Sequence, residues 1–332
     1  MDKRSLYFLF ALPVLMIGAA ALTKFPQADI NNGLVHARIY LPDATRGYYR
    51  GTRFDWSAVM PDLEWNGHRY CAEWFNDYSP VKNDAIMGPV ESFSPLGFAA
   101  AKPGGSFVQV GVGKLAKMQE AVYNPFSYYP VIDYGTWTIK KQKASITFMH
   151  ILQDSAYGYE YEKTVALVKD KPAMLLIHTL KNTGQQKIET DVYNHNLFVM
   201  DEQATGPGYT VGLPFMITAS AEGQRGFGDN GITAISDSLL VFNRRLIKGE
   251  SAYAVLSGYS SNAKDYDIKI ENHTTGAAVK ITCDQPLSKL VFWASARIFS
   301  PEPYIKLNIL PGETFSWTIS YTFYNCTVLK ED

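Results

Sequence analysis

The sequence predicts an all-β protein that folds as one large antiparallel β-sandwich. Short β-rich runs, separated by turn residues, follow one another at spacings of roughly 10–20 residues between their centres. No pattern of helical period lies between them, which excludes the alternating strand–helix units of a parallel sheet. Phe, Trp and Tyr make up 14% of the chain. Aromatic residues favour strands and also stack on sugars, so this excess fits both a β fold and a carbohydrate site.

The predicted strands are defined by alternating or continuous apolar runs that end at turn residues. They cover residues 35–41, 107–112, 145–152, 159–168, 173–180, 188–193, 239–243, 253–258, 266–272, 278–282, 289–294 and 315–323. Helix-like segments are short, such as residues 115–121. Residues 43–105 are rich in Gly, Pro and aromatic residues and are predicted to form long loops, where functional sites tend to lie. We predict a single domain from residue 25 to residue 329.

The first 21 residues have the pattern of a secretory signal peptide. Lys3 and Arg4 precede an apolar run over residues 6–17, and small residues follow at 18–21. The run is shorter than the roughly 20 residues that a membrane-spanning helix needs. We therefore expect an exported protein, periplasmic or extracellular. The alternative is an uncleaved N-terminal anchor, which is the one membrane contact that we expect.

Charge and cysteine content exclude several classes of protein. The chain has 31 basic and 32 acidic residues, and this balance argues against nucleic acid as a partner, because phosphates select a basic surface. Three cysteines, Cys71, Cys283 and Cys326, are too few for a disulfide framework and fit no zinc pattern. A Cys283–Cys326 bridge and free buried thiols remain equal alternatives.

Two segments carry residues suited to acid–base chemistry. His195 lies between Asn194 and Asn196, neighbours that can fix its tautomer and orient its ring, as a proton donor requires. Glu302 lies between two prolines beside Tyr304, and a carboxylate in an aromatic pocket is desolvated, which raises its pKa toward that of a working base. The alternatives are a histidine satisfied within a turn and a strand-edge glutamate fixed by proline geometry.

These two segments, in this order, resemble the aldose 1-epimerase (galactose mutarotase) superfamily. Residues 194–198, Asn-His-Asn-Leu-Phe, resemble its Asn-His-x-Tyr/Leu-Phe segment, and Glu302-Pro-Tyr followed by Pro311-Gly-Glu resembles its late Glu-Pro stretch. The resemblance implies a large antiparallel β-supersandwich with the site on a concave face, acting on a mono- or oligosaccharide. It implies an isomerase in which His195 protonates the ring oxygen and Glu302 takes the anomeric proton, a reaction that needs no metal or cofactor.

One departure from the family keeps other functions open. The superfamily carries a further histidine in an upstream Gly-rich loop, and residues 88–113 contain none. A lyase or hydrolase acting on an acidic glycan is one alternative, in which a tyrosine or His195 removes the C5 proton. A non-catalytic carbohydrate-binding protein of the same fold is the other.

The loop Arg50-Gly-Thr-Arg-Phe-Asp-Trp is predicted to hold the sugar. Its arginines and acid can make bidentate hydrogen bonds, its tryptophan can stack, and an arginine can bind the carboxylate of a uronate. The alternative is a structural ion pair from Arg53 to Asp55 or Glu73, with Trp56 in the core. The predicted substrate-binding residues are Arg50, Arg53, Asp55, Trp56, Asn194, Asn196 and Tyr304.

Overall fold

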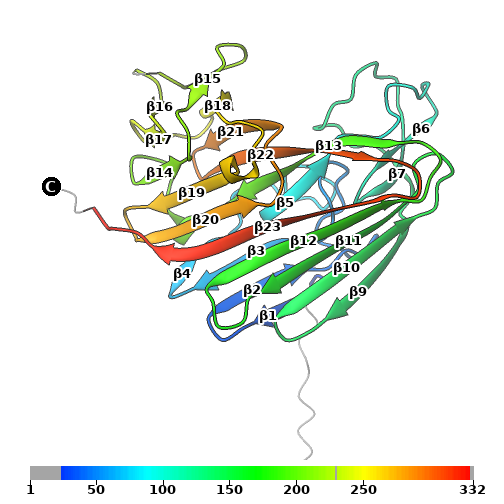
Figure 1. The fold of residues 1–332 in the computed structure, drawn as a ribbon, viewed down its shortest axis with the longest axis horizontal. Helices are drawn as coiled ribbons and strands as arrows, with labels where there is room; N and C mark the ends of the chain where they lie inside the picture. The colour runs from blue at the N-terminus through cyan, green and yellow to red at the C-terminus, as the bar shows by residue number, and fades with distance from the viewer. Residues whose placement is uncertain (1–23, 229, 330–332) are drawn as a thin grey trace, which may run out of the picture.

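The computed structural model describes residues 24–228 and 230–329, and strands form nearly all of its regular secondary structure (Figure 1). The described residues contain no α-helix, only the two 3-10 turns η1 (Met200–Glu202) and η2 (Ala263–Asp265). The all-β prediction is therefore confirmed. None of these short helices has the length and apolarity needed to cross a membrane. The predicted signal peptide, residues 1–21, lies outside the described residues.

A ten-stranded antiparallel sheet forms one layer, in the order β16-β17-β14-β19-β20-β23-β12-β11-β10-β9. Its strands are β9 (Thr136–Lys141), β10 (Ser145–Leu152), β11 (Tyr159–Leu167), β12 (Ala173–Asn182), β14 (Tyr209–Gly212), β16 (Thr233–Ser236), β17 (Leu239–Phe242), β19 (Asp267–Asn272), β20 (Ala277–Cys283) and β23 (Thr314–Asn325). Buried and partly buried residues alternate along β10 and β11, as expected for strands with one face on a core.

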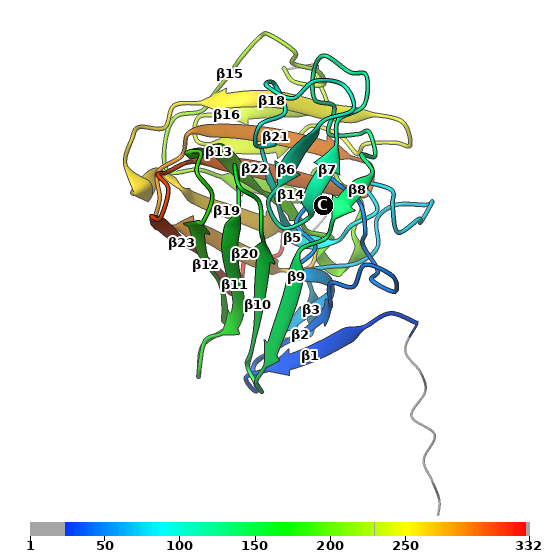
Figure 2. The same ribbon diagram turned by 90° about the vertical axis from the view of Figure 1, so that its right-hand side faces the viewer.

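A six-stranded antiparallel sheet, in the order β15-β18-β21-β22-β13-β5, carries the residues of greatest functional interest. Its strands are β5 (Gly88–Phe93), β13 (Ile188–Leu197), β15 (Thr218–Ala219), β18 (Ser251–Ser257), β21 (Lys289–Ser295) and β22 (Ile298–Ile309). Figure 2 shows β18 and β21 lying across the direction of β9–β12. Apolar side chains from both sheets join in one buried cluster, including Leu176 and Trp317 from the large sheet and Phe292 and Leu307 from the smaller one.

Two smaller sheets complete the described fold. One contains β1 (Gln27–Asn31), β2 (Val35–Tyr40), β3 (Val59–Trp65) and β4 (His68–Arg69), and the other contains β6 (Ser106–Gln109), β7 (Gly113–Ala116) and β8 (Val131–Asp133). A second buried cluster, which includes Tyr48, Phe54 and Trp56, packs the loops against Tyr193 and Leu197 of β13.

Some elements differ from the sequence-based expectation. The predicted loop region 43–105 contains β3 and β5, and the helix-like segment 115–121 begins instead at the end of β7. All six residues of β5 are buried, so it shows no alternation, and Pro89 sits within it. A strand with proline is tolerated here because β5 is an edge strand, where one side needs no ladder hydrogen bonds.

The three cysteines are unpaired. The ladder of β20 and β23 places Cys283 opposite Ile319, whereas Ala277, at the other end of β20, lies opposite Asn325 and next to Cys326. Six residues of strand separate the two ends, which is roughly 20 Å at the usual rise of a β-strand. A Cys283–Cys326 bridge is therefore impossible in this fold.

A buried group of charged side chains joins the two large sheets. The Nζ of Lys163 on β11 lies 3.2 Å from Oδ2 of Asp55 and 2.6 Å from Oε2 of Glu91 on β5. The imidazole of His178 on β12 lies 2.9 Å from the Glu91 carboxylate. Burial acts to raise the pKa of Glu91, but His178 and Lys163 outweigh it and lower that pKa to about 2. Glu91 is therefore ionised and paired on both sides.

We expect Lys163→Met to reduce the free energy of unfolding by about 3–5 kcal/mol, because it leaves two buried carboxylates without their shared cation. Urea denaturation followed by tryptophan fluorescence measures this change. Lys181→Met is the matched control, since the Lys181–Glu160 pair is 44% and 42% exposed. Equal stability of the two variants would show that the buried lysine does not hold the sheets together.

Candidate active site

The neighbouring strands β13 and β22 bring His195 and Glu302 together. Their ladder pairs Tyr193 with Tyr304, and two further residues along β13 place His195 beside Glu302. The Nε2 atom of His195 lies 3.4 Å from Oε1 of Glu302. Pro301 and Pro303 have no amide hydrogen, and the ladder of β22 with β13 ends before them, at Tyr304, whereas its pairing with β21 continues. The two separate segments that carry the family resemblance are therefore in contact in the folded protein.

Burial sets the protonation of this pair. His195 is 6% exposed and Glu302 is 7% exposed. Burial, with a contribution from the positive charge of Arg53, lowers the pKa of His195 well below its ordinary value, so its ring is neutral at neutral pH. Burial raises the pKa of Glu302 to about 7, although Arg53 and Lys289 act to lower it. Near neutral pH, Glu302 therefore gains and loses a proton readily.

The side chain of Arg53 lines a cavity beside His195 and Glu302 and is held there by several contacts. Its guanidinium donates to Oδ1 of Asp84 at 2.6 Å and to the hydroxyl of Tyr193 at 2.8 Å. The same group lies between two aromatic rings, 4.7 Å from the ring centre of Phe54 and 4.9 Å from that of Phe126. The positive charge of the Arg53 guanidinium is therefore already compensated by the carboxylate of Asp84.

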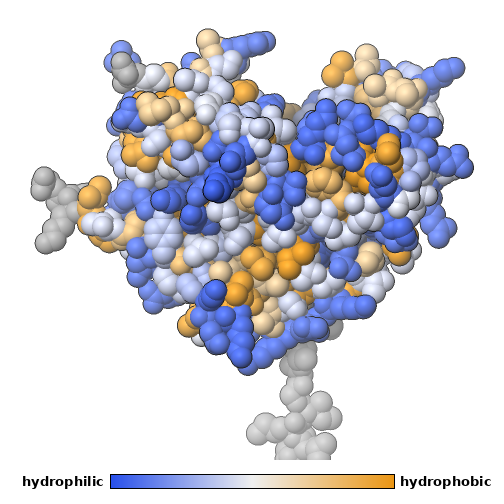
Figure 3. Space-filling model, viewed as in Figure 1, coloured by the Kyte–Doolittle hydropathy of each residue, from blue (hydrophilic) through white to orange (hydrophobic). Residues whose placement is uncertain are grey.

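These groups line a cavity of about 410 Å³. Its aromatic lining includes Trp74, Tyr253, Trp293 and Tyr304. The volume lies in the range of small-molecule sites, and aromatic walls with a few polar groups suit a sugar ring. Figure 3 shows the surface hollowed between two raised parts, the side that carries β15 and β18 and the side that carries β6 and β7. Tyr253 belongs to β18, and Phe126 belongs to the loop that follows β7.

No protein-family model and no curated protein matches the sequence. Solved structures do match its fold. A putative aldose 1-epimerase from Escherichia coli K12 is 14% identical, with a TM-score of 0.51, over 91% of this chain and 100% of that one. A galactose mutarotase related enzyme from Lactobacillus acidophilus is 13% identical, with a TM-score of 0.54, over 92% and 100%.

A galactose mutarotase-like protein from Clostridium acetobutylicum is 12% identical, with a TM-score of 0.56, over 90% of this chain and 95% of that one. The chain has the galactose mutarotase-like fold. Matches over nine tenths of the chain show that the likeness extends through its whole architecture. At identities of 10–14%, they show the fold and leave the chemistry to be argued from the residues of the cavity.

Four of the residues predicted from sequence line the cavity of this mutarotase-like fold, namely His195, Glu302, Arg53 and Tyr304. The ring of Tyr304 stacks on Tyr193 at a centroid distance of 4.7 Å, and its β22 neighbour Ser300 contacts His195, with Oγ 2.7 Å from Nδ1. The structure thus brings the predicted acid, the predicted base and two of the predicted binding residues into one cavity.

The other predicted binding residues do not reach the cavity. Successive side chains of a strand point to opposite faces, so Asn194 and Asn196 point away from His195, toward the core. Asn194 donates to the hydroxyl of Tyr321 at 2.8 Å, and that hydroxyl donates to Asn196 at 3.0 Å. Asn196 also donates to the carbonyl of Pro301 at 3.0 Å, which ties β13 to β22 beside the pair. The two asparagines therefore hold β13 in position from the core side of the sheet, opposite the face that carries His195.

Of the predicted sugar-binding loop, only Arg53 and Phe54 line the cavity, and Arg53 is the only one of its predicted binding residues that does so. Asp55 is buried against Lys163. Trp56 lies in the core and donates from Nε1 to the carbonyl of Gly51 at 2.7 Å. Arg50 donates to the carbonyl of Ala44 at 3.4 Å. The structural alternative is thus the one observed for Trp56, while Arg53 pairs with Asp84 and not with Asp55 or Glu73.

Sequence reasoning missed several lining residues, among them Asp84, Phe126, Arg225, Tyr253 and Trp293. Tyr253 and Trp293 lie on predicted strands, where aromatics usually belong to the core. Asp84, Phe126 and Arg225 lie in three separate connections with no motif around them. Their convergence depends on the folding of distant segments, and nothing in their local sequence indicates it.

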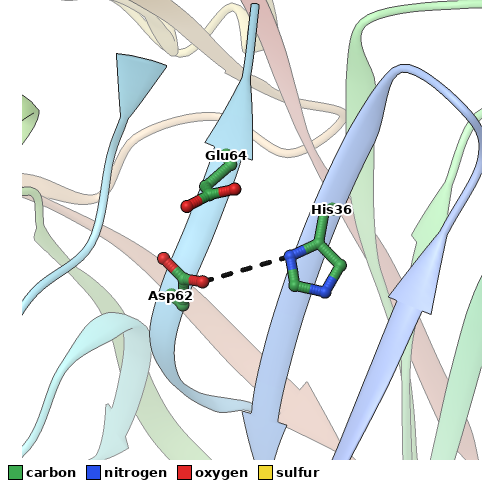
Figure 4. Close-up of side chains that lie close together, drawn as sticks. All are labelled: His36, Asp62 and Glu64. Carbon is green, nitrogen blue, oxygen red and sulfur yellow. Dashed lines mark ion pairs between the residues drawn. The ribbon is translucent and has the colours of Figure 1, made fainter. Parts of the chain in front are cut away.

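The described residues contain one cluster with the composition of a metal site. His36 on β2 and Asp62 and Glu64 on β3 lie on the four-stranded sheet, and their ligand atoms are all within 4.8 Å of one another (Figure 4). Arg69 lies 3.2 Å from Asp62 and 3.7 Å from Glu64. Its positive charge compensates the two carboxylates that a metal would need. None of these residues lines the cavity.

We expect Glu302→Gln to become more stable relative to the wild type as the pH rises from 4.5 to 7. A group with a raised folded-state pKa stabilises the fold below its unfolded pKa, and that contribution is lost as the pH rises through the folded pKa. A pKa raised from 4.5 to about 7 corresponds to a change of at most about 3 kcal/mol.

Thermal and urea unfolding at pH 5 and pH 8 measure this difference. Glu162→Gln, at a partly exposed position on β11, is the control and should show no such trend. A variant whose stability relative to the wild type is the same at both pH values would contradict a desolvated Glu302.

Proposed function

We propose that the protein interconverts the anomers of a sugar by acid–base ring opening in this cavity. The observation that carries the proposal is the contact between buried His195 and Glu302, with a 3.4 Å separation, in an aromatic-lined cavity. The anomeric hydroxyl oxygen and the ring oxygen are both bonded to C1. An acid and a base close together can therefore act on both oxygens of one sugar.

The reaction conserves atoms and electrons without any co-reactant. Glu302 takes the proton of the anomeric hydroxyl, and O1 forms a double bond to C1. The C1–O5 bond breaks, its electron pair goes to O5, and O5 takes a ring proton of the neutral His195, which regains a proton from the protonated Glu302 beside it. Rotation about the C1–C2 bond and the reverse steps on the other face of the carbonyl give the other anomer and restore both side chains.

The surroundings of the pair support these roles. The Ser300 hydroxyl lies 2.7 Å from Nδ1 of His195 and donates to the carbonyl of Pro301 at 3.3 Å, so Ser300 ties the imidazole ring to β22 and fixes its orientation. A pKa of about 7 suits Glu302 as a base, because general bases work best when their pKa lies near the operating pH. The charged and apolar start of the sequence supports action in the periplasm or outside the cell.

The lyase alternative is less well supported by the cavity. It needs a tyrosine or His195 to remove a C5 proton. Burial raises the pKa of Tyr193 to about 12 and raises those of Tyr253 and Tyr304. A phenolate base is therefore rare at neutral pH. His195 remains available, and formation of an unsaturated product from alginate or pectin, absorbing near 235 nm, would favour that reaction.

We expect the protein spanning residues 22–332 to accelerate exchange between α and β anomeric signals in proton exchange NMR with hexoses, pentoses and uronic acids. His195→Ala and Glu302→Gln should each lower the enzymatic rate by at least about 100-fold. The rate should rise with pH around a midpoint near 7, as Glu302 loses its proton.

His36→Ala, on β2 and outside the cavity, is the control and should retain the wild-type rate. Binding of a sugar without any acceleration would support the non-catalytic alternative. Acceleration that survives in both site variants would overturn the assignment of the pair.

A further inference from the structure

We propose that the cavity selects sugars carrying an anionic group outside the ring, and that Arg225 binds this group. The proposal rests on the proposed function where it places the sugar ring beside His195 and Glu302. The negative charge of the ligand is argued independently, from Arg225. Arg225 lies in the connection between β15 and β16 and lines the cavity beside Tyr253. Nothing in its local sequence marks it as a binding residue.

The structure holds Arg225 in place without neutralising it. Its backbone exchanges two hydrogen bonds of 3.0 Å with Tyr253, and its Nε donates to Oγ of Ser251 at 2.8 Å. The guanidinium carbon lies 5.2 Å from the ring centre of Tyr253. These contacts fix the backbone and Nε and leave the four outer N–H groups of the fork for a ligand. Such preorganisation reduces the cost of ordering the side chain on binding.

The two arginines of the cavity differ in charge balance. Arg53 is compensated by Asp84 at 2.6 Å. Among residues 24–228 and 230–329, no carboxylate forms an ion pair with Arg225. Lys289 adds a second positive charge, with its Nζ 5.0 Å from the ring centre of Tyr304. Lys289 belongs to β21 and does not line the cavity, so Arg225 is the lining cation whose charge an anionic ligand can neutralise.

Arg225 and Glu302 lie within reach of one sugar. The charges of Arg225 and Glu302 both shift the pKa of the Tyr253 hydroxyl, so both groups lie near this one side chain. An anion on the exocyclic carbon can meet Arg225 while the C1 end of the ring meets Glu302 and His195. A guanidinium fork binds carboxylate and phosphate oxygens in pairs, so a uronate and a sugar phosphate present the same recognition chemistry.

The test compares glucuronate and glucose 6-phosphate with glucose. NMR titration gives the dissociation constants, and exchange NMR gives the anomerisation rates. We expect the wild type to bind at least one anionic sugar more tightly than glucose. Arg225→Gln should weaken that binding by roughly 10–100-fold, as for loss of a charged hydrogen-bonded group, and should weaken the binding of glucose by a much smaller factor. The better of the two anions identifies carboxylate or phosphate as the natural group.

Arg244→Gln is the matched control, because Arg244 pairs with the carboxylate of Glu250 and does not line the cavity. Equal affinity of the wild type for all three sugars, or an anion preference unchanged in Arg225→Gln, would overturn the proposal. Anion-selective binding that depends on Arg225 but brings no anomer exchange would leave this proposal standing and refute the proposed reaction.

Discussion

The ammonium group of Lys163 is the contact on which the rest of the structure depends. It lies between the carboxylates of Asp55 and Glu91, and so joins the ten-stranded sheet to the edge of the six-stranded one. Asp55 also belongs to the loop that carries Arg53. The amide of Asp55 donates to the carbonyl of Glu91 at 2.8 Å, and the Ser92 hydroxyl donates to the carbonyl of Arg53 at 2.8 Å. One buried cation thus fixes the sandwich and the wall of the cavity together.

The same burial that holds the site also weakens the fold there. Glu302 keeps its negative charge in a place from which water is largely removed, and its pKa of about 7 records that cost. A group suited to proton transfer near neutral pH is therefore a group that disfavours folding at higher pH. Sites of this kind are expected where function, and not stability, has determined the residue.

The sequence predicts the fold class and four of the residues that line the cavity, for a physical reason. His195 and Glu302 stand in short segments whose prolines and asparagines have local consequences, and adjacent strands then bring those segments together. The sequence predicts Asn194 and Asn196 as part of the same site because they flank His195 in the chain. A strand turns alternate residues to opposite faces, so they support the core face instead. Strand β5 was missed because burial on both faces removes the alternation by which strands are recognised.

Arg225 and Asp84 could not be predicted because their role depends on which charges meet in the folded protein. Arg53 drew attention in the sequence, yet Asp84 compensates it. Arg225 drew none, yet of the two arginines that line the cavity it is the one without a carboxylate partner among the described residues. Arg53 acts on the pair from the side, since its charge lowers the pKa of both His195 and Glu302. An anionic group bound in the cavity acts in the opposite direction and favours the protonated form of each. The charge of the bound ligand would then help to determine whether His195 and Glu302 are protonated. Substrate recognition and acid–base chemistry in this cavity therefore depend on the same electrostatic interactions.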